Sequence, residues 1–283
     1  METVESECKL FTVEQERRNA MRIGMSTACF YPQPLEEALP IIAGLGVRAI
    51  EIFFNTESEF QPRFYEALGA QARSLGLDVV SVHPYTSLME GMLLFSDYVR
   101  RTEDGLMQYQ RYFECAAALG ARFLTFHGER NMGQQDDPAR WERKCAVYRR
   151  LCQIGAACGI TLAQENVAWC RSRDPAFVHA LYRDVPELRY TLDIKQAYRA
   201  GQSWKAFLDA MGERLVNVHI NDFSAEQSCL MPGEGAMDYA DFFSRLRTKG
   251  YDGHTIIEVY RTNFDAPEEL GGAVRTLSRF ASL

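Results

Sequence analysis

Short apolar runs recur along the whole chain, and a helical pattern follows each of them. Most runs are apolar at every position until their last residues, which is typical of parallel strands that helices cover. The runs are RIGMS (22–26), AIEIFF (49–54), LDVVSVH (77–83), RFLTFHG (122–128), ITLAQEN (160–166), RYTLDI (189–194), LVNVHIND (215–222) and TIIEVY (255–260). This alternation predicts an α/β protein, a single (β/α)8 TIM barrel with parallel strands and an outer ring of helices.

The helical patterns between these runs support the barrel against its main alternative. They lie at 34–46, 62–76, 105–120, 137–159, 174–185, 203–212, 238–250 and 267–281. A doubly wound sheet would usually show a glycine-rich turn after an early strand, whereas AGLG at 43–46 precedes a strand and is expected to end a helix. We expect residues 1–20 to be an N-terminal extension and residues 21–283 to form the barrel.

Charge and composition exclude several classes of partner. The chain has 31 Lys and Arg against 38 Asp and Glu, a formal net charge of −7, which disfavours binding to a nucleic-acid backbone. It has no apolar run long enough to span a membrane, and its first residues, METVESECKL, lack the apolar core of a signal peptide. The 8 cysteines form no CxxC pair. We therefore predict free thiols and a cytoplasmic protein without nucleic-acid or membrane partners.

Potential ligands and acid–base groups follow six successive strands. Chemistry in a (β/α)8 barrel is carried out at the carboxyl ends of its strands, where these side chains would share one rim. A single polar residue at a strand end would mean little, but the third to eighth strands each supply one. These residues are His83, His127, Glu165, Asp193, His219 and Glu258.

Four of these residues predict a metal site. Glu165, Asp193 and Glu258 would repel one another if they converged with His219 and no cation lay between them. We therefore expect one divalent metal ion bound by these four residues. Three oxygen donors and one nitrogen suit a fairly hard ion, with Mn²⁺ as first choice and Mg²⁺, Co²⁺ or Zn²⁺ as alternatives.

The roles of the two rim histidines stay open. His83 and His127 could hydrogen-bond a substrate hydroxyl, which we favour, bind a second metal with Glu165, or simply fill the rim. Glu51, in the second strand, could point into the barrel and orient the site, or be a structural buried carboxylate. The other predicted substrate-binding residues are Gln196, Lys195, Trp169 and Tyr85.

The ordered set of strand ends resembles a known superfamily. The segments VSVHPY, LTFHGE, LAQENVAW, TLDIKQA, VNVHINDF, PGEGAMDY and IIEVY are similar to those of the xylose-isomerase-like TIM-barrel superfamily. The match is closer to its sugar phosphate isomerase/epimerase branch, a relative of the apurinic endonucleases of the endonuclease IV type, and covers roughly residues 21–280. The resemblance implies that Glu165, Asp193, His219 and Glu258 hold the metal, and that the two glutamates act as acid and base.

Two departures from the family pattern limit what the resemblance implies. Many members have Asp-x-x-His on the sixth strand, where this chain has Gln196, which can hydrogen-bond a hydroxyl but cannot titrate. The endonucleases place Asp-x-His after the seventh-strand histidine to hold a third zinc ion, whereas NDFSAEQSCLMPGEG contains no histidine. A trinuclear site, and with it DNA repair, is not expected.

A metal ion flanked by two carboxylates suits proton abstraction next to a carbonyl. We predict an enzyme, a metal-dependent isomerase or epimerase of a sugar or sugar phosphate, with Glu165 and Glu258 as the catalytic pair and a metal-bound enediolate. The alternative is a keto-sugar or inosose dehydratase or lyase with His127 or His83 as the acid, and a phosphodiester hydrolase is less favoured. The expected partner is a small carbohydrate, and the resemblance implies a homo-oligomer.

Overall fold

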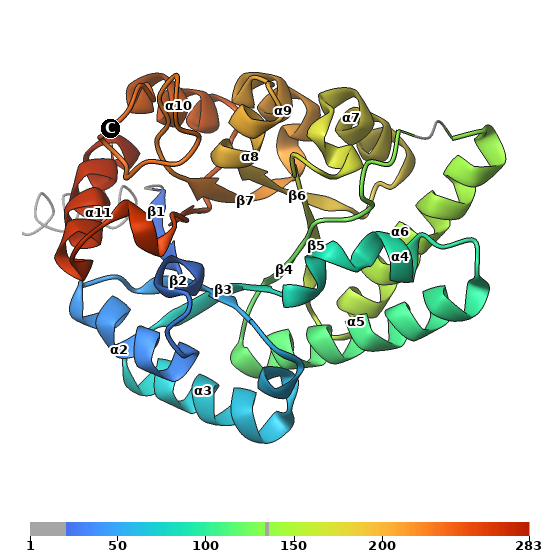
Figure 1. The fold of residues 1–283 in the computed structure, drawn as a ribbon, viewed down its shortest axis with the longest axis horizontal. Coiled ribbons are helices and arrows are strands. Elements are labelled where there is room, and N and C mark those ends of the chain that lie inside the picture. The colour runs from blue at the N-terminus through green and yellow to red at the C-terminus, as the bar shows by residue number, and fades with distance from the viewer. Residues whose placement is uncertain (1–20, 134–135, 283) are drawn as a thin grey trace, which may run out of the picture.

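Eight parallel strands close into one barrel in the computed structural model, which describes residues 21–133 and 136–282. Each strand pairs with its neighbours in chain order, and β8 closes the barrel against β1 (Figure 1). The strands are β1 (Arg22–Ser26), β2 (Ala49–Phe53), β3 (Asp78–His83), β4 (Phe123–Phe126), β5 (Thr161–Glu165), β6 (Arg189–Asp193), β7 (Leu215–Ile220) and β8 (His254–Ile257). The fold prediction is confirmed, while the predicted extension, residues 1–20, lies outside the described residues.

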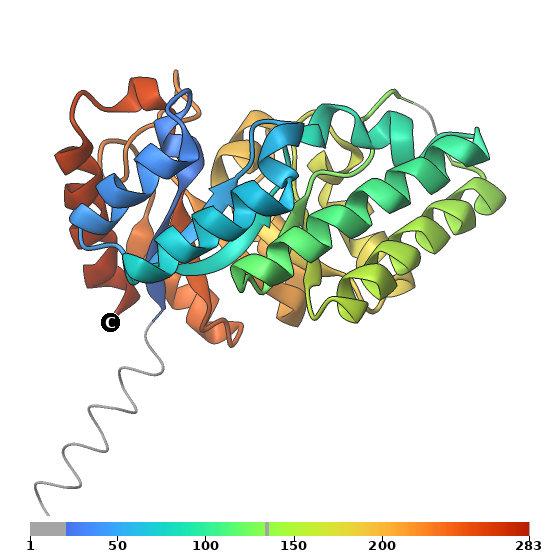
Figure 2. The ribbon, with the colours of Figure 1, turned by 90° about the horizontal axis from the view of Figure 1, so that it is seen from below.

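The helices surround this barrel, as two perpendicular views show (Figures 1 and 2). They are α2 (Leu35–Gly44), α3 (Pro62–Ser74), α4 (Glu90–Leu94), α5 (Val99–Leu119), α6 (Pro138–Ala157), α7 (Pro175–Asp184), α8 (Ile194–Arg199), α9 (Trp204–Met211), α10 (Tyr239–Thr248) and α11 (Pro267–Ala281). Each predicted helical pattern corresponds to one of these helices. The short helices α4 and α8 were not expected, and α5 begins earlier than its pattern indicated.

Alternation along the strands divides the barrel wall into an outer and an inner set of side chains. Ile50 and Ile52 belong to the apolar cluster between the strands and the helices. Glu51, between them, is completely buried and accepts a hydrogen bond from Ser81 Oγ at 2.6 Å and one from Asn217 Nδ2 at 3.3 Å. Ser81 lies on the neighbouring strand β3, whereas Asn217 lies on β7, which does not pair with β2, so its bond crosses the barrel interior. The helices thus cover an apolar outer layer, while the interior below the strand ends is polar.

The prediction of free thiols is confirmed for the cysteines that the structure describes. The seven described cysteines are free, and six of them are buried. Burial raises the pKa of the Cys29 thiol to about 12, so that this sulfur behaves as a small apolar group. Within residues 21–133 and 136–282, no helix is long and apolar enough to cross a membrane.

The packing of α6 on the barrel can be tested at Gly155. A Cβ at this position would lie 2.7 Å from the carbonyl oxygen of Ile160 and 2.8 Å from the ring of Phe113. We expect Gly155→Ala to lower the free energy of unfolding by about 1–3 kcal/mol, because the backbone of Ile160 cannot move aside cheaply. The measurement is the urea midpoint followed by circular dichroism.

Gly44→Ala is the matched control. Gly44 is the last residue of α2, and a Cβ there would meet nothing within 4 Å. This variant should be neutral or stabilising by less than about 1 kcal/mol, because alanine favours the helix. Equal midpoints for the two variants would show that α6 does not pack on the barrel as described.

Candidate active site

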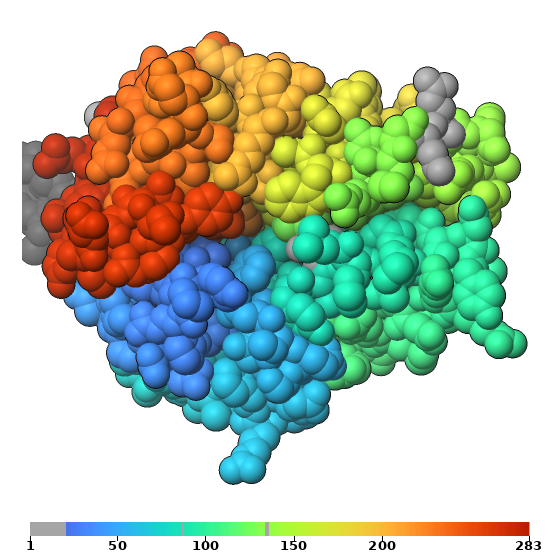
Figure 3. Space-filling model, viewed as in Figure 1, coloured from blue at the N-terminus to red at the C-terminus, as the bar shows by residue number. Residues whose placement is uncertain are grey.

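The predicted site residues gather at the carboxyl ends of the strands, on the face seen in Figure 3. A pocket of about 420 Å³ opens there. Its wall is largely apolar, with Phe53, Val259 and Tyr260 among the lining side chains. The predicted site residues that line it are His83, His127, Glu165, Trp169, Lys195, Gln196 and Glu258.

The four predicted metal ligands lie close together, and two of them, Glu165 and Glu258, line this pocket. His219 Nδ1 lies 2.7 Å from Glu258 Oε2, 3.6 Å from Asp193 Oδ2 and 3.9 Å from Glu165 Oε1. Glu165 and Asp193 end β5 and β6, and Glu258 directly follows β8. Glu165, Asp193 and His219 also form one of the groups whose donor atoms are close enough to bind a common ion.

The donor atoms of this cluster fit a divalent cation. Asp193 Oδ2, His219 Nδ1 and Glu258 Oε2 are buried, and none makes a hydrogen bond among the described residues. Buried polar atoms without partners are costly, and most have a hydrogen bond or an ion. Three carboxylate oxygens and one imidazole nitrogen form a donor set suited to a metal of intermediate hardness.

The electrostatics of the cluster show how strongly it attracts positive charge. Burial favours neutral His219, but the carboxylates of Glu51 and Glu258 outweigh burial and raise the imidazole pKa well above its usual value. Burial also opposes ionisation of Glu165, yet the neighbouring imidazole of His127 holds the pKa of Glu165 well below its usual range. The protein's own positive charge in this cluster comes from His219 and from Lys195, whose ammonium lies 3.2 Å from Glu258 Oε1.

Glu51 fixes the orientation of His219 from below. Glu51 Oε2 lies 3.1 Å from His219 Nε2 and also accepts hydrogen bonds from Ser81 and Thr125. The same imidazole holds the pKa of Glu51 below its usual value despite burial. Because ionised Glu51 only accepts hydrogen bonds, Nε2 carries a proton and Nδ1 faces the carboxylate cluster.

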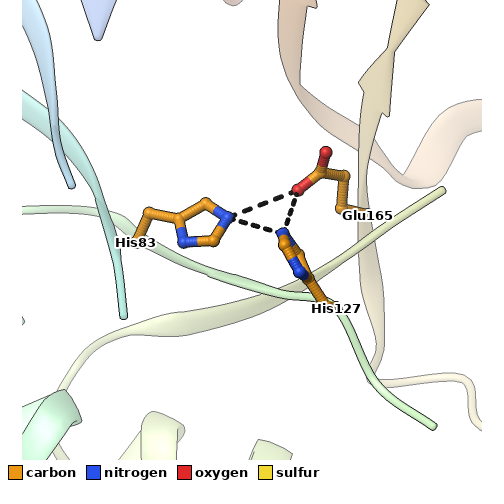
Figure 4. Close-up of side chains that lie close together, drawn as sticks. All are labelled: His83, His127 and Glu165. Carbon is orange, nitrogen blue, oxygen red and sulfur yellow. Dashed lines mark hydrogen bonds and ion pairs between the residues drawn. The ribbon is translucent and has the colours of Figure 1, made fainter. Parts of the chain in front are cut away.

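His83 and His127 form a second group around Glu165 (Figure 4). Their Nε2 atoms are 2.8 Å apart, and Glu165 Oε2 lies 3.0 Å from His127 Nε2 and 3.4 Å from His83 Nε2. Burial lowers the pKa of His83, but its contact with Glu165 outweighs burial and raises the pKa above its usual value. The group could hold one proton between the rings, contact a substrate hydroxyl or bind an ion.

The residues after Asp193 form α8. Lys195 and Gln196, both predicted to bind substrate, lie in this helix and line the pocket. Asp193 caps α8, with Oδ1 accepting a hydrogen bond from the backbone N–H of Gln196 at 2.8 Å. The Gln196 side chain accepts one from the backbone N–H of Ala168 at 3.3 Å. Lys195 is buried and its ammonium lies 3.2 Å from Glu258 Oε1, so it is already paired with a carboxylate.

The two aromatic residues predicted to contact substrate lie in different environments. Trp169 lines the pocket, packs edge-on against His127 with 5.9 Å between ring centroids, and has an indole N–H that is buried without a hydrogen-bond partner among the described residues. Tyr85 is not among the described lining residues. Its hydroxyl donates to Glu57 at 3.3 Å and its ring packs against Phe60.

Gln164 is a positioning residue that sequence reasoning missed. Its buried amide donates to the backbone carbonyls of His127 and Glu165, both at 2.7 Å, and Tyr148 donates to its Oε1 at 3.0 Å. Gln164 thus fixes the backbone of two rim residues from outside the barrel. The signal was a polar residue at the position before Glu165 in the run ITLAQEN, which alternation places on the opposite, outer face of the strand.

Fold and site together define a (β/α)8 barrel with a cluster of candidate metal ligands at the carboxyl ends of its strands. The family model described as xylose isomerase-like TIM barrel matches residues 39–280. The chain therefore belongs to the xylose isomerase-like TIM-barrel family, which confirms the resemblance of the strand-end motifs.

Individual relatives cover nearly the whole chain at low identity. An uncharacterized protein of Mycobacterium tuberculosis is 25% identical over 298 residues, covering 93% of this chain and 98% of the relative. Fructoselysine 3-epimerase of Shigella flexneri is 24% identical over 277 residues, with the same coverage. The crystal structure of D-psicose 3-epimerase from Clostridium cellulolyticum, with D-tagatose, superposes with a TM-score of 0.77 at 16% identity, covering 92% of this chain and 99% of the other. The two named relatives are carbohydrate epimerases, which agrees with the prediction of an enzyme.

Elemental analysis of protein purified without chelator tests the metal site. We expect about one equivalent of divalent metal, because four donors converge on one point, and its loss in Asp193→Ala. Two or more equivalents would bring His83 and His127 into the ligand set. No metal after soaking with Mn²⁺ or Zn²⁺ would contradict the site.

Replacing Glu51 tests its role in orienting His219. Glu51→Gln keeps the volume but allows its amide to face Nε2, which removes the fixed proton position of the imidazole. We expect metal affinity to fall about 10–100-fold, measured by competition with a coloured chelator. Ser81→Ala, which removes one donor to Glu51 and leaves the carboxylate, should have a smaller effect. Unchanged affinity in Glu51→Gln would show that His219 does not depend on this contact.

Proposed function

We propose that this protein is a metal-dependent carbohydrate epimerase or isomerase that moves a proton on the carbon next to a carbonyl. One observation carries the proposal: Glu165 and Glu258 line the same pocket and both approach His219 Nδ1, at 3.9 and 2.7 Å. Two carboxylates around one point can serve as a base and an acid for the same substrate.

The four residues Glu165, Asp193, His219 and Glu258 would hold the metal ion, with Mn²⁺ as the preferred ion and Mg²⁺, Co²⁺ or Zn²⁺ as alternatives. When bound, a divalent ion supplies a Lewis acid that polarises a substrate carbonyl and stabilises developing negative charge. The protein's own buried and unpartnered donor atoms support this assignment.

The two glutamates have different neighbours, which suits different roles in proton transfer. Glu165 lies among the imidazoles of His83 and His127, while Glu258 lies beside the ammonium of Lys195. One glutamate removes the proton next to the carbonyl and leaves an enediolate. The other returns a proton to the opposite face in an epimerase, or to the neighbouring carbon in an isomerase.

The remaining polar residues of the pocket would bind and orient the sugar. His83 and His127 are placed to hydrogen-bond hydroxyls near Glu165, and the unpartnered indole N–H of Trp169 offers one more donor. Gln196 is already bonded to the backbone of Ala168, so that its amide is held in one orientation at the pocket wall. The apolar wall excludes water from the reacting carbon.

The comparisons support a sugar substrate, since the named relatives act on fructoselysine and D-psicose. A dehydratase or lyase remains the second candidate, because Glu165 raises the pKa of His83, and His83 or His127 beside it could act as the acid that expels a hydroxyl. The homo-oligomeric state and the cytoplasmic location stay predictions.

Exchange of carbon-bound protons with solvent deuterium, followed by NMR on a panel of ketoses, tests the function. We expect exchange by the Mn²⁺-loaded protein, and a fall in rate of about 100–10,000-fold in Glu165→Gln and in Glu258→Gln, because each removes one proton-transfer group. Products of unchanged mass indicate an epimerase or isomerase, whereas loss of water indicates the dehydratase.

Metal content is measured on the same samples, because both glutamates are also predicted ligands. Glu66→Gln, an exposed carboxylate on α3, is the control and should exchange at the wild-type rate. Metal-loaded Gln variants that keep full exchange would contradict the assignment of the pair.

A further inference from the structure

A buried carboxyl group outside the metal-ligand cluster lies close to the strand ends. Glu90 is the first residue of α4 and is only 1% exposed, and burial raises the pKa of its carboxyl group. Burying such a group is costly unless its oxygens accept hydrogen bonds. The backbone N–H of Gly128 donates to Glu90 Oε2 at 2.6 Å, and the hydroxyl of Tyr109 donates to Oε1. Glu90 therefore joins α4 to the residue that directly follows His127.

The peptide bond between His127 and Gly128 is held on both sides. Its carbonyl oxygen accepts a hydrogen bond from Gln164 Nε2 at 2.7 Å, and its N–H donates to Glu90. Gly128 has a φ of +82°, and a Cβ there would lie 2.7 Å from Gln164 Oε1, so the backbone passes close to that amide. This peptide unit cannot turn without leaving a buried polar group unpaired.

His127 differs from the other two histidines of the site in how its ring is held. The far ring nitrogen of His83, Nδ1, lies 3.0 Å from the carbonyl oxygen of the next residue, and His219 Nε2 lies 3.1 Å from Glu51. His127 Nδ1 is buried and makes no hydrogen bond within residues 21–133 and 136–282. The backbone of His127 and the packing of its ring therefore direct its Nε2 toward Glu165, 3.0 Å away (Figure 4).

The segment that carries Glu90 also adjoins the active pocket. Leu88, two residues earlier, lines this pocket. The helix α4 packs closely on the segment after β4, since a Cβ at Gly91 would lie 3.0 Å from the backbone nitrogen of Arg130. Through Tyr109, Glu90 is also bonded to α5. Glu90 thus lies where the loop after β3, the loop after β4 and a long outer helix meet.

We propose that Glu90 is a positioning residue for proton transfer. By accepting the N–H of Gly128 it fixes the backbone of His127, and the backbone directs the imidazole at Glu165 and at the substrate. The hydrogen bond acts here, and the charge of Glu90 does not. This inference rests on the proposed function and adds a residue that no direct contact with the reacting groups would identify. A small displacement of a reacting or orienting group can cost a large factor in rate.

A single NMR signal reports on this peptide bond. Of the 5 histidines, only His127 precedes a glycine, so protein labelled with ¹³C at the histidine carbonyl and ¹⁵N in glycine gives one carbonyl–amide correlation. We expect its amide proton to move upfield and to exchange faster with solvent in Glu90→Leu and in the shorter Glu90→Asp, because both remove the acceptor. Glu90→Gln should leave the signal near its wild-type position, since its amide can accept from Gly128 and donate to Tyr109.

Exchange of ketose protons with solvent deuterium is measured on the same metal-loaded variants at saturating sugar. We expect the rate to fall about 10–100-fold in Glu90→Leu and Glu90→Asp, and to be rescued in Glu90→Gln. Metal content should stay at the wild-type value, because no described hydrogen bond of Glu90 reaches a predicted metal ligand. Tyr109→Phe is the matched control. It removes the donor to Oε1 and leaves the Gly128 contact, so it should lower the urea midpoint without slowing exchange.

The two readouts separate this inference from the proposed reaction. An unmoved signal in Glu90→Leu and Glu90→Asp, or wild-type exchange by both, would overturn the inference even where ketoses exchange. Slow exchange in Glu90→Gln with its signal in place would also overturn it, because charge would then be the cause. Slowing by Tyr109→Phe as large as that by Glu90→Asp would assign the effect to stability and overturn it as well. A moved signal without exchange of any ketose by the wild type would contradict the proposed reaction and support the contact.

Discussion

Compensation of buried negative charge is the constraint on which the site depends. Glu51, Glu165, Asp193 and Glu258 approach the single imidazole of His219 in the interior of the barrel. Isolated carboxylates there would be protonated or would destabilise the fold. The Glu51 oxygen that faces His219, Oε2, also accepts hydrogen bonds from Ser81 and Thr125, whereas Asp193 Oδ2 and Glu258 Oε2, which face the same imidazole, make no described hydrogen bond.

This difference separates a structural carboxylate from functional ones. Without a metal ion, the positive charge comes from the imidazolium of His219 and from Lys195, which lies 3.2 Å from Glu258. A metal ligand must be neutral imidazole, so an ion that binds Nδ1 takes the place of a proton. Binding of metal and release of that proton are therefore coupled, and Glu51 keeps Nε2 protonated in both states.

Strand order and strand ends were predictable because both follow from local patterns. Continuous apolar runs identified the eight strands, and parallel closure then required His83 through Glu258 to share one rim. The loops were less predictable. The helix α4 lies in an apolar segment without clear periodicity, and α8 begins directly after β6 because Asp193 caps it. The contacts of Gln164 and Tyr85 depend on tertiary packing, which no spacing in the sequence encodes.

The residues at the strand ends define the type of reaction more closely than they define the substrate. A cluster of carboxylates and imidazoles can activate a proton next to a carbonyl in many sugars, and the apolar wall of the active pocket offers few contacts that tell one ketose from another. Selectivity then has to come from groups beyond the reacting carbons. Trp169 and Tyr260 line the active pocket from the loops after β5 and β8, outside the strands that fix the catalytic residues. Such loops can change without disturbing the barrel, so substrate choice and proton transfer can be altered independently.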